Sequence, residues 1–238
     1  MSEIMRPMSI GHLMHWIMSE YEQKKSIFGI EKIVKHENGQ ALPIYEEKIE
    51  SPFGPAAGPN SQLAQNIVAA YVAGSRFFEL KTVQVMDGAD LAACISRPCI
   101  IAGDECYNCE WSTELFVPQA MEEYIKAWFL LKVISKEFGL GSPDGFQFNM
   151  SCGYNLEGIK DKKIDDFIEG LKDARDTEVF KECKTWLLDH ADLFEHVTKE
   201  DIEAIPSEIC NSITLSTMHG CPPQEIENIV MYLLKEKH

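Results

Sequence analysis

The chain has 238 residues, of which 45% are hydrophobic and 25% are charged, a composition typical of soluble globular proteins. Its net charge of −16 disfavours nucleic-acid binding through a basic surface, because phosphate contacts require Lys and Arg. No apolar run is long enough to span a bilayer, and the first residues lack the basic and apolar regions of a secretory signal. We therefore expect a cytoplasmic protein with reduced cysteines and with neither nucleic acid nor membrane as a partner.

In chain order, the pattern begins with an amphipathic helix predicted over residues 8–24. The Gly-, Pro- and Ala-rich stretch 51–60 marks a strand-to-loop transition. Residues 61–74 predict a helix that ends at Gly74, and residues 76–85 predict a strand because they are rich in aromatic and β-branched side chains. The clearest helix pattern covers residues 118–141, with a proline near its start and a glycine at its end.

The second half continues the alternation of strands and helices. We predict strands at 145–151 and 207–220, and helices at about 163–173, 177–193 and 222–238. Strands that alternate with helices at this spacing indicate parallel βα units. The sequence therefore predicts an α/β fold.

Polar residues gather where the predicted strands end. Asn149, Ser151 and Cys152 close one strand within "FNMSCGYN", Lys81 lies in another, and residues 217–221 follow a third. In (β/α) barrels and in open α/β sheets, ligands bind at the carboxyl ends of the strands. We therefore expect these residues to face a ligand.

Each of these residues also has a purely structural interpretation. Asn149 and Ser151 can bond a local turn, with Cys152 as a small packing residue. In the functional interpretation, the Asn149 amide donates and accepts hydrogen bonds with a ligand, and the Cys152 thiol transfers a proton. Lys81 either extends to solvent from the strand end, or acts as a cation beside an electron-rich ring or as a Schiff-base amine.

Three further motifs carry weaker signals. Cys106-x-x-Cys109 is a single pair, and because a structural zinc site needs four ligands, we predict no metal site. His219 is a candidate acid/base group. The small residues of 54–59 form a turn, or let the backbone approach a flat ligand closely.

Together these stretches resemble the flavin-binding barrels of the dihydroorotate and dihydropyrimidine dehydrogenase superfamily. "FGPAAGP" resembles the first barrel strand, which implies that Ala56 and Ala57 contact FMN. "ELKTV" resembles the second, with Lys81 at the lysine that contacts the flavin. "NMSC" is similar to the Asn-x-Ser-Cys segment of these enzymes, which implies that Asn149 binds flavin and substrate and that Cys152 is the acid/base opposite the flavin.

The resemblance also implies a substrate pocket and partner modules. "NCEWSTE" is similar to the segment whose asparagine and glutamate line the pyrimidine pocket, which points to Asn108 and Glu110. Most specifically, the chain resembles the N-terminal part of the bacterial "putative selenate reductase subunit", a multidomain flavin and iron–sulfur oxidoreductase. This implies a small unsaturated or heterocyclic substrate, electron-transfer modules or subunits as partners, and FAD and iron–sulfur clusters only in modules outside this chain.

We therefore predict a partial (β/α) TIM-type barrel of about four βα units. Residues 1–45 form an N-terminal helical extension in this prediction, and residues 46–238 form the first half of a truncated, dihydroorotate-dehydrogenase-like FMN barrel. Because a closed barrel has eight units and commonly holds phosphate after the last two strands, we expect this chain alone to bind FMN weakly or not at all and to self-associate. Two alternatives stay open: a non-catalytic half-barrel that acts as an assembly module, and a lyase that uses Lys81 as a Schiff-base amine.

Overall fold

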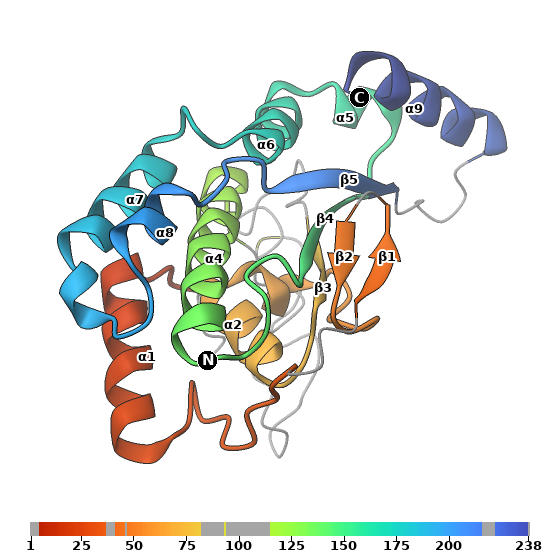
Figure 1. Ribbon diagram of the computed structural model, residues 1–238. Helices are drawn as coiled ribbons and strands as arrows, with labels where there is room; N and C mark the ends of the chain where they lie inside the picture. The colour runs from red at the N-terminus through yellow and green to blue at the C-terminus, as the bar shows by residue number, and fades with distance from the viewer. Residues whose placement is uncertain are drawn as a thin grey trace.

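A computed structural model describes residues 5–36, 41–45, 47–81, 93, 115–215 and 222–237. Helices and strands alternate along these ranges, with two 3₁₀ turns, η1 and η2 (Figure 1). In chain order the elements are α1 (Ile10–Lys24), β1 (Leu42–Ile44), β2 (Glu47–Ile49), η1 (Pro59–Gln62), α2 (Ala64–Val72), β3 (Phe77–Lys81), α4 (Val117–Glu137), β4 (Gln147–Cys152), α5 (Leu156–Ile159), α6 (Lys162–Lys172), α7 (Glu178–Asp189), η2 (Ala191–Leu193), α8 (Lys199–Glu203), β5 (Cys210–Leu215) and α9 (Pro223–Glu236).

A parallel sheet with the strand order β3-β4-β5 forms the centre of the molecule. Residues 53–57 run along the other edge of β3 in the same direction, since Arg76 N donates to Phe53 O at 3.0 Å and Glu79 N donates to Pro55 O at 3.4 Å. A Cβ at Gly54 would overlap the Phe77 carbonyl, so this close approach requires glycine. The spatial order of the four segments is thus their order in the chain, as in a (β/α) barrel, and the described part of the sheet does not close.

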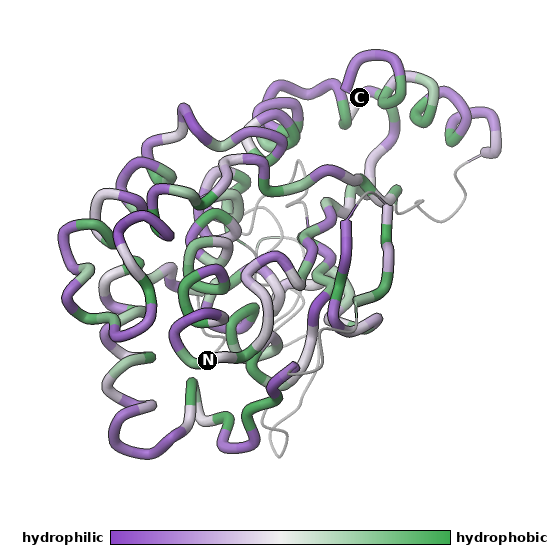
Figure 2. The backbone as a smooth tube through the Cα atoms, viewed as in Figure 1, coloured by the Kyte–Doolittle hydropathy of each residue, from purple (hydrophilic) through white to green (hydrophobic). Residues whose placement is uncertain are grey.

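Helix α4 is the centre of the helical layer. Its residues are apolar around most of its circumference, which is typical of a buried helix. The Trp128 ring lies 5.6 Å from that of Phe148 on β4, and Phe148 in turn lies 5.5 Å from Phe78 on β3. Figure 2 shows hydrophobic segments converging on α4 and the strands beside it. This packing fixes which face of the sheet is apolar.

Most of the predicted elements are confirmed. The first helix begins after Ser9, whose hydroxyl accepts from His12 N, and the helix at 61–74 ends before Gly74, which has a φ of +111°. The strands at 76–85 and 207–220 are confirmed as far as Lys81 and Leu215, and their remaining residues lie outside the described ranges. The short helices α5 and α8, of four and five residues, were not predicted.

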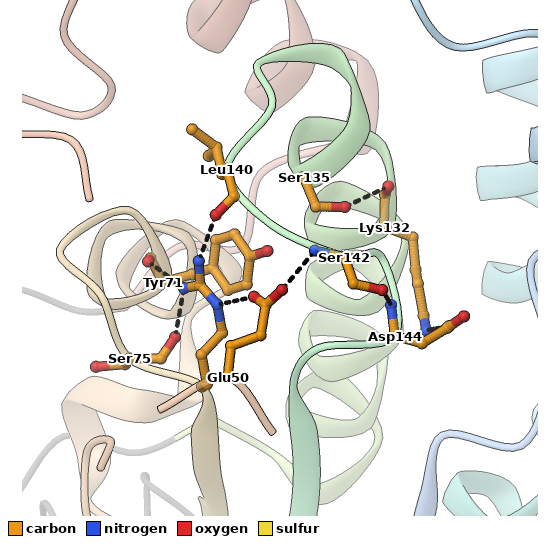
Figure 3. A network of polar contacts seen from close by, with 9 residues as sticks. Glu50, Tyr71, Ser75, Lys132, Ser135, Leu140, Ser142 and Asp144 are labelled. Carbon is orange, nitrogen blue, oxygen red and sulfur yellow. Dashed lines mark hydrogen bonds and ion pairs between the residues drawn. The ribbon is translucent and has the colours of Figure 1, made fainter. Parts of the chain in front are cut away.

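A β1–β2 hairpin lies near the amino ends of the sheet strands. Glu50, which follows β2, accepts from Ser142 N at 2.7 Å and pairs with Arg76 at 3.1 Å (Figure 3). Arg76 also donates to the carbonyl oxygens of Tyr71 and Leu140, each at 2.9 Å. The hairpin straddles residue 45, and the division into 1–45 and 46–238 remains a prediction.

Candidate functional site

The two faces of strands β3 and β4 differ in chemistry. Because side chains alternate along a strand, Phe78, Phe148 and Met150 point toward the helices, and the residues between them point to the opposite face. We call this opposite face the polar face. Its polar members on these two strands are Glu79, Lys81, Gln147, Asn149 and Ser151, and Phe77 at the start of β3 lies on the same face.

The strand register arranges the polar face in layers. Glu79 lies opposite Asn149, and Lys81 lies opposite Ser151. Ser151 in turn lies opposite Thr214 of β5, so Lys81, Ser151 and Thr214 form one layer across three strands. This layer is at the carboxyl end of the sheet, where (β/α) barrels bind their ligands.

An irregularity in β5 adds polar groups to the same face. Cys210 pairs with Phe148 and Ile213 pairs with Met150, so three steps on β5 match two on β4. The extra residue lets both Asn211 and Ser212 reach Gln147, whose Nε2 lies 2.6 Å from Asn211 Oδ1 and 3.3 Å from Ser212 Oγ.

Asn149 is the best-fixed residue of the polar face. It is fully buried, and its Oδ1 accepts from Ser212 Oγ at 2.7 Å. Its Nδ2 donates to Thr214 Oγ1 at 2.7 Å and to Met150 O at 3.3 Å. An amide held by three hydrogen bonds has one orientation, so Asn149 is preorganised for a ligand.

The small-residue segment is tied to this face through Glu79. Ala57 N donates to Glu79 Oε2 at 3.3 Å, and both residues are half-buried, whereas Ala56 is exposed. On the other side, the Lys81 carbonyl accepts from the Tyr124 hydroxyl of α4 at 2.6 Å. Ala57, Lys81 and Asn149 thus belong to three neighbouring segments of one sheet.

Comparisons with known proteins identify the family. A family model described as "Oxidoreductase YgfK, N-terminal TIM-barrel domain" matches residues 28–238. The chain belongs to the YgfK family. Two relatives, both named "Putative oxidoreductase YgfK", from Escherichia coli K12 and Escherichia coli O157:H7, are each 44% identical over 251 residues. These matches cover 100% of this chain but 24% of each relative. No solved structure matches.

Membership of the YgfK family confirms two predictions. The resemblance to the N-terminal part of a larger oxidoreductase is confirmed, and so is the partial (β/α) barrel, with its unclosed parallel sheet. Among the described residues, no helix is both long and apolar enough to cross a bilayer. The site residues, the cofactors and the substrate remain predictions for this YgfK relative.

Cys152 lies on a different face of the sheet from Lys81 and Asn149. It is 1% exposed and belongs to the apolar core, two residues after Met150. Asn108 and Glu110 lie outside the described residues, as do Cys106, Cys109 and His219. Within the described ranges, no cluster of three or more His, Cys, Asp or Glu could hold a metal ion.

Sequence reasoning missed four polar-face residues: Glu79, Gln147, Ser212 and Thr214. The alternation in "SITL" could have placed Ser212 and Thr214 on one face. Nothing in the sequence indicates that β5 gains a residue relative to β4, so the contacts of Asn211 and Ser212 with Gln147 required the structure.

Proposed function

We propose that this chain supplies the first half of an FMN-binding barrel in an oxidoreductase, with the flavin lying on the polar face. The observation that carries the proposal is the buried, fully oriented Asn149 beside the layer that contains Lys81 and Thr214. Parallel sheets are usually apolar on both faces. A face that carries polar groups and the charged residues Glu79 and Lys81 therefore favours a ligand there. Bound FMN would supply hydride transfer.

The size, charge and hydrogen-bonding groups of the residues on this face suit a flavin ring. The segment at Gly54 approaches β3 closely, and its small side chains at Ala56 and Ala57 leave room for a flat ring. Lys81 provides a cation that stabilises negative charge on an electron-rich ring, and Asn149 provides a fixed amide. Asn108 and Glu110 are the proposed substrate contacts, by resemblance.

Cys152 is the proposed proton donor or acceptor for the substrate. To act there, its side chain must turn from the apolar core toward the polar face, because in the described structure it lies on the helix side of β4. It is the last residue of β4 and lies opposite Leu215 of β5, so this turn would have to disrupt the last pairing of the two strands. General acid–base groups contribute about 10²–10⁴-fold to rate.

The substrate and partners of the whole protein belong to the same proposal. We propose a small unsaturated or heterocyclic substrate, such as a pyrimidine or purine relative, and electron-transfer modules or subunits that carry FAD and iron–sulfur clusters. The chain spans 24% of the length of the curated relatives, which leaves room for such modules in proteins of that size.

Flavin content tests the proposal. The protein purified at its natural length should contain about one FMN per chain, and Lys81→Met should weaken FMN binding at least about tenfold, since charged hydrogen-bond partners contribute about 1.5–3 kcal/mol. Lys235→Met, on an exposed turn of α9, is the matched control and should bind like the wild type. A flavin-free protein that also fails to bind added FMN would refute the proposal and favour the assembly-module alternative.

A further inference from the structure

A hydrogen-bonded network runs along the polar face, and acceptor-only groups fix its direction. At its amino end, Asn211 Nδ2 lies 3.3 Å from Glu47 Oε1, and a carboxylate can only accept. Asn211 therefore turns its oxygen toward Gln147, and Gln147 must present its Nε2 in return. The Gln147 Oε1 atom is left buried, and no described residue hydrogen-bonds to it.

The direction is fixed independently at Asn149. Its Nδ2 lies 3.3 Å from the Met150 carbonyl oxygen, which also can only accept. The amide nitrogen is therefore the atom that faces Thr214 Oγ1 at 2.7 Å, and the amide oxygen must take the Ser212 proton. The Ser212 hydroxyl and the Asn149 amide therefore use their protons for hydrogen bonds within the network.

Within the described part of the chain, Thr214 ends the network with an unused donor. Its oxygen accepts from Asn149, and no described residue accepts its own hydroxyl proton. The residue is half-buried and lies on the polar face, in the same layer as Ser151 and Lys81. A hydroxyl that already accepts a hydrogen bond becomes a better donor, because bonds in a chain polarise one another.

We propose that Thr214 is a ligand-binding residue whose hydroxyl donates a hydrogen bond to a ring nitrogen or carbonyl oxygen of the flavin. This inference rests on the proposed flavin function. Thr214 and Lys81 are two strand spacings apart, about 10 Å, in one layer. They can therefore contact opposite ends of a planar ring system that lies across the strands.

The test compares two substitutions that differ in the hydroxyl. FMN is titrated into the flavin-free protein of natural length, and binding is followed by quenching of flavin fluorescence. Thr214→Val keeps the side-chain shape but lacks the hydroxyl, which is both the donor and the acceptor of Asn149 Nδ2, and it should raise the Kd for FMN at least about three- to tenfold, the equivalent of one net hydrogen bond. Thr214→Ser keeps the donor and should bind within about twofold of the wild type.

Each other outcome has a distinct meaning. Wild-type affinity in Thr214→Val overturns the inference and leaves the flavin function standing. Equal weakening in Thr214→Ser and Thr214→Val also overturns it, since the methyl group and not the hydroxyl would then matter. If the wild-type protein does not bind FMN, the inference and the proposed function both fail. Thermal unfolding without FMN verifies that each variant is folded.

Discussion

At the scale of single residues, Glu79 and Asn149 show how unusual the polar face is. They lie opposite each other in adjacent parallel strands, where both faces of a sheet are normally apolar. Asn149 satisfies its buried amide through Ser212, Thr214 and Met150, so its burial carries no unpaired donor or acceptor. Such fully paired amides hold one orientation, which is what a binding site requires.

Cysteine labelling tests the position of Cys152. Cys152, Cys183 and Cys210 are all buried, so we expect iodoacetamide to leave the three thiols of the folded flavin-free protein unmodified and to label all three in urea. Burial raises the pKa of Cys183 to about 12 and that of Cys210 well above its usual value, which makes them matched internal controls.

Peptide mass spectrometry after a timed labelling reaction gives the measurement. Selective labelling of Cys152 in the folded protein would contradict the buried position and show that its thiol reaches the polar face, as its acid/base role requires. Selective labelling that begins only when FMN is added would mean that the ligand turns the side chain.

At the residue level, the sequence singled out polar residues that interrupt an apolar run. Asn149 and Lys81 stood out for that reason, and both lie on the polar face, while their roles in binding remain predictions. The same reasoning placed Cys152 with Asn149, although a spacing of three residues along a strand leads to opposite faces. Thr214 could not be singled out from the sequence. Its proposed role depends on the hydrogen bonds that Asn149 and Ser212 already make, and these are visible only in the structure.

At the scale of elements, a buried ion pair joins the hairpin to the sheet. The Arg76 side chain is 0% exposed and that of Glu50 is 6% exposed, and the guanidinium also lies over the Tyr71 ring at 3.8 Å (Figure 3). The last turn of α2 and the loop after α4 both form hydrogen bonds with this pair. Breaking it should loosen the amino end of the sheet.

Glu50→Gln should therefore destabilise the protein strongly. The change leaves Arg76 as an uncompensated buried charge, and we expect a loss of about 3–5 kcal/mol of unfolding free energy. Glu208→Gln is the matched control, since the Arg175–Glu208 pair is more than half exposed and should contribute less than about 1 kcal/mol. Urea unfolding followed by circular dichroism measures both, and equal effects would contradict the importance of burial.

His36 makes the same region sensitive to acid. Burial, and then the Arg76 guanidinium, lower the pKa of His36 below 6.5, while Glu50 partly opposes this shift. Its buried Nε2 has no hydrogen-bond partner among the residues that the structure describes, so protonation would place an unpaired charge beside Arg76. Because the unfolded state binds this proton more readily, stability is retained above pH 6.5 and falls as pH drops toward the lowered pKa.

Substitution of His36 tests this dependence on pH. Between about pH 7 and pH 5 the wild type should lose unfolding free energy, and His36→Gln should lose less of it over the same range. His12→Gln, at an exposed position of α1, should follow the wild type. Urea unfolding at each pH gives the values, and parallel curves for wild type and His36→Gln would exclude His36 as the cause.

Helices and strands were predicted most accurately where the apolar residues recur with a clear period. The long helices α1 and α4 and the strand β4 have clear apolar periods and terminal signals, so they were located within a few residues. The hairpin strands have three residues each with burial patterns that show no alternation, and α8 has five residues. Such short elements are set by tertiary contacts, here those of Glu50 and Glu47, which a local pattern does not carry.

At the scale of the whole molecule, the last described strand and the last described helix both leave surface uncovered. Within the described part of the sheet β5 pairs on one side only. Helix α9, which follows β5 in the chain and packs against α5, lies at the outer edge of the molecule and carries hydrophobic turns (Figures 1 and 2). Met231 and Leu234 on this helix are 60% and 57% exposed. An unpaired strand edge and exposed apolar side chains each favour association.

We therefore expect the 238-residue chain to self-associate through α9 and the β5 edge. Sedimentation velocity at increasing protein concentration should show dimers or larger species, despite the net charge of −16. The double substitution Met231→Gln and Leu234→Gln removes the apolar side chains without changing the charge, and it should shift the distribution toward monomer. Asn228→Gln, at an exposed polar position of the same helix, should leave it unchanged. A wild-type chain that stays monomeric at all concentrations would contradict self-association, whereas association that the double variant leaves intact would move the contact away from α9.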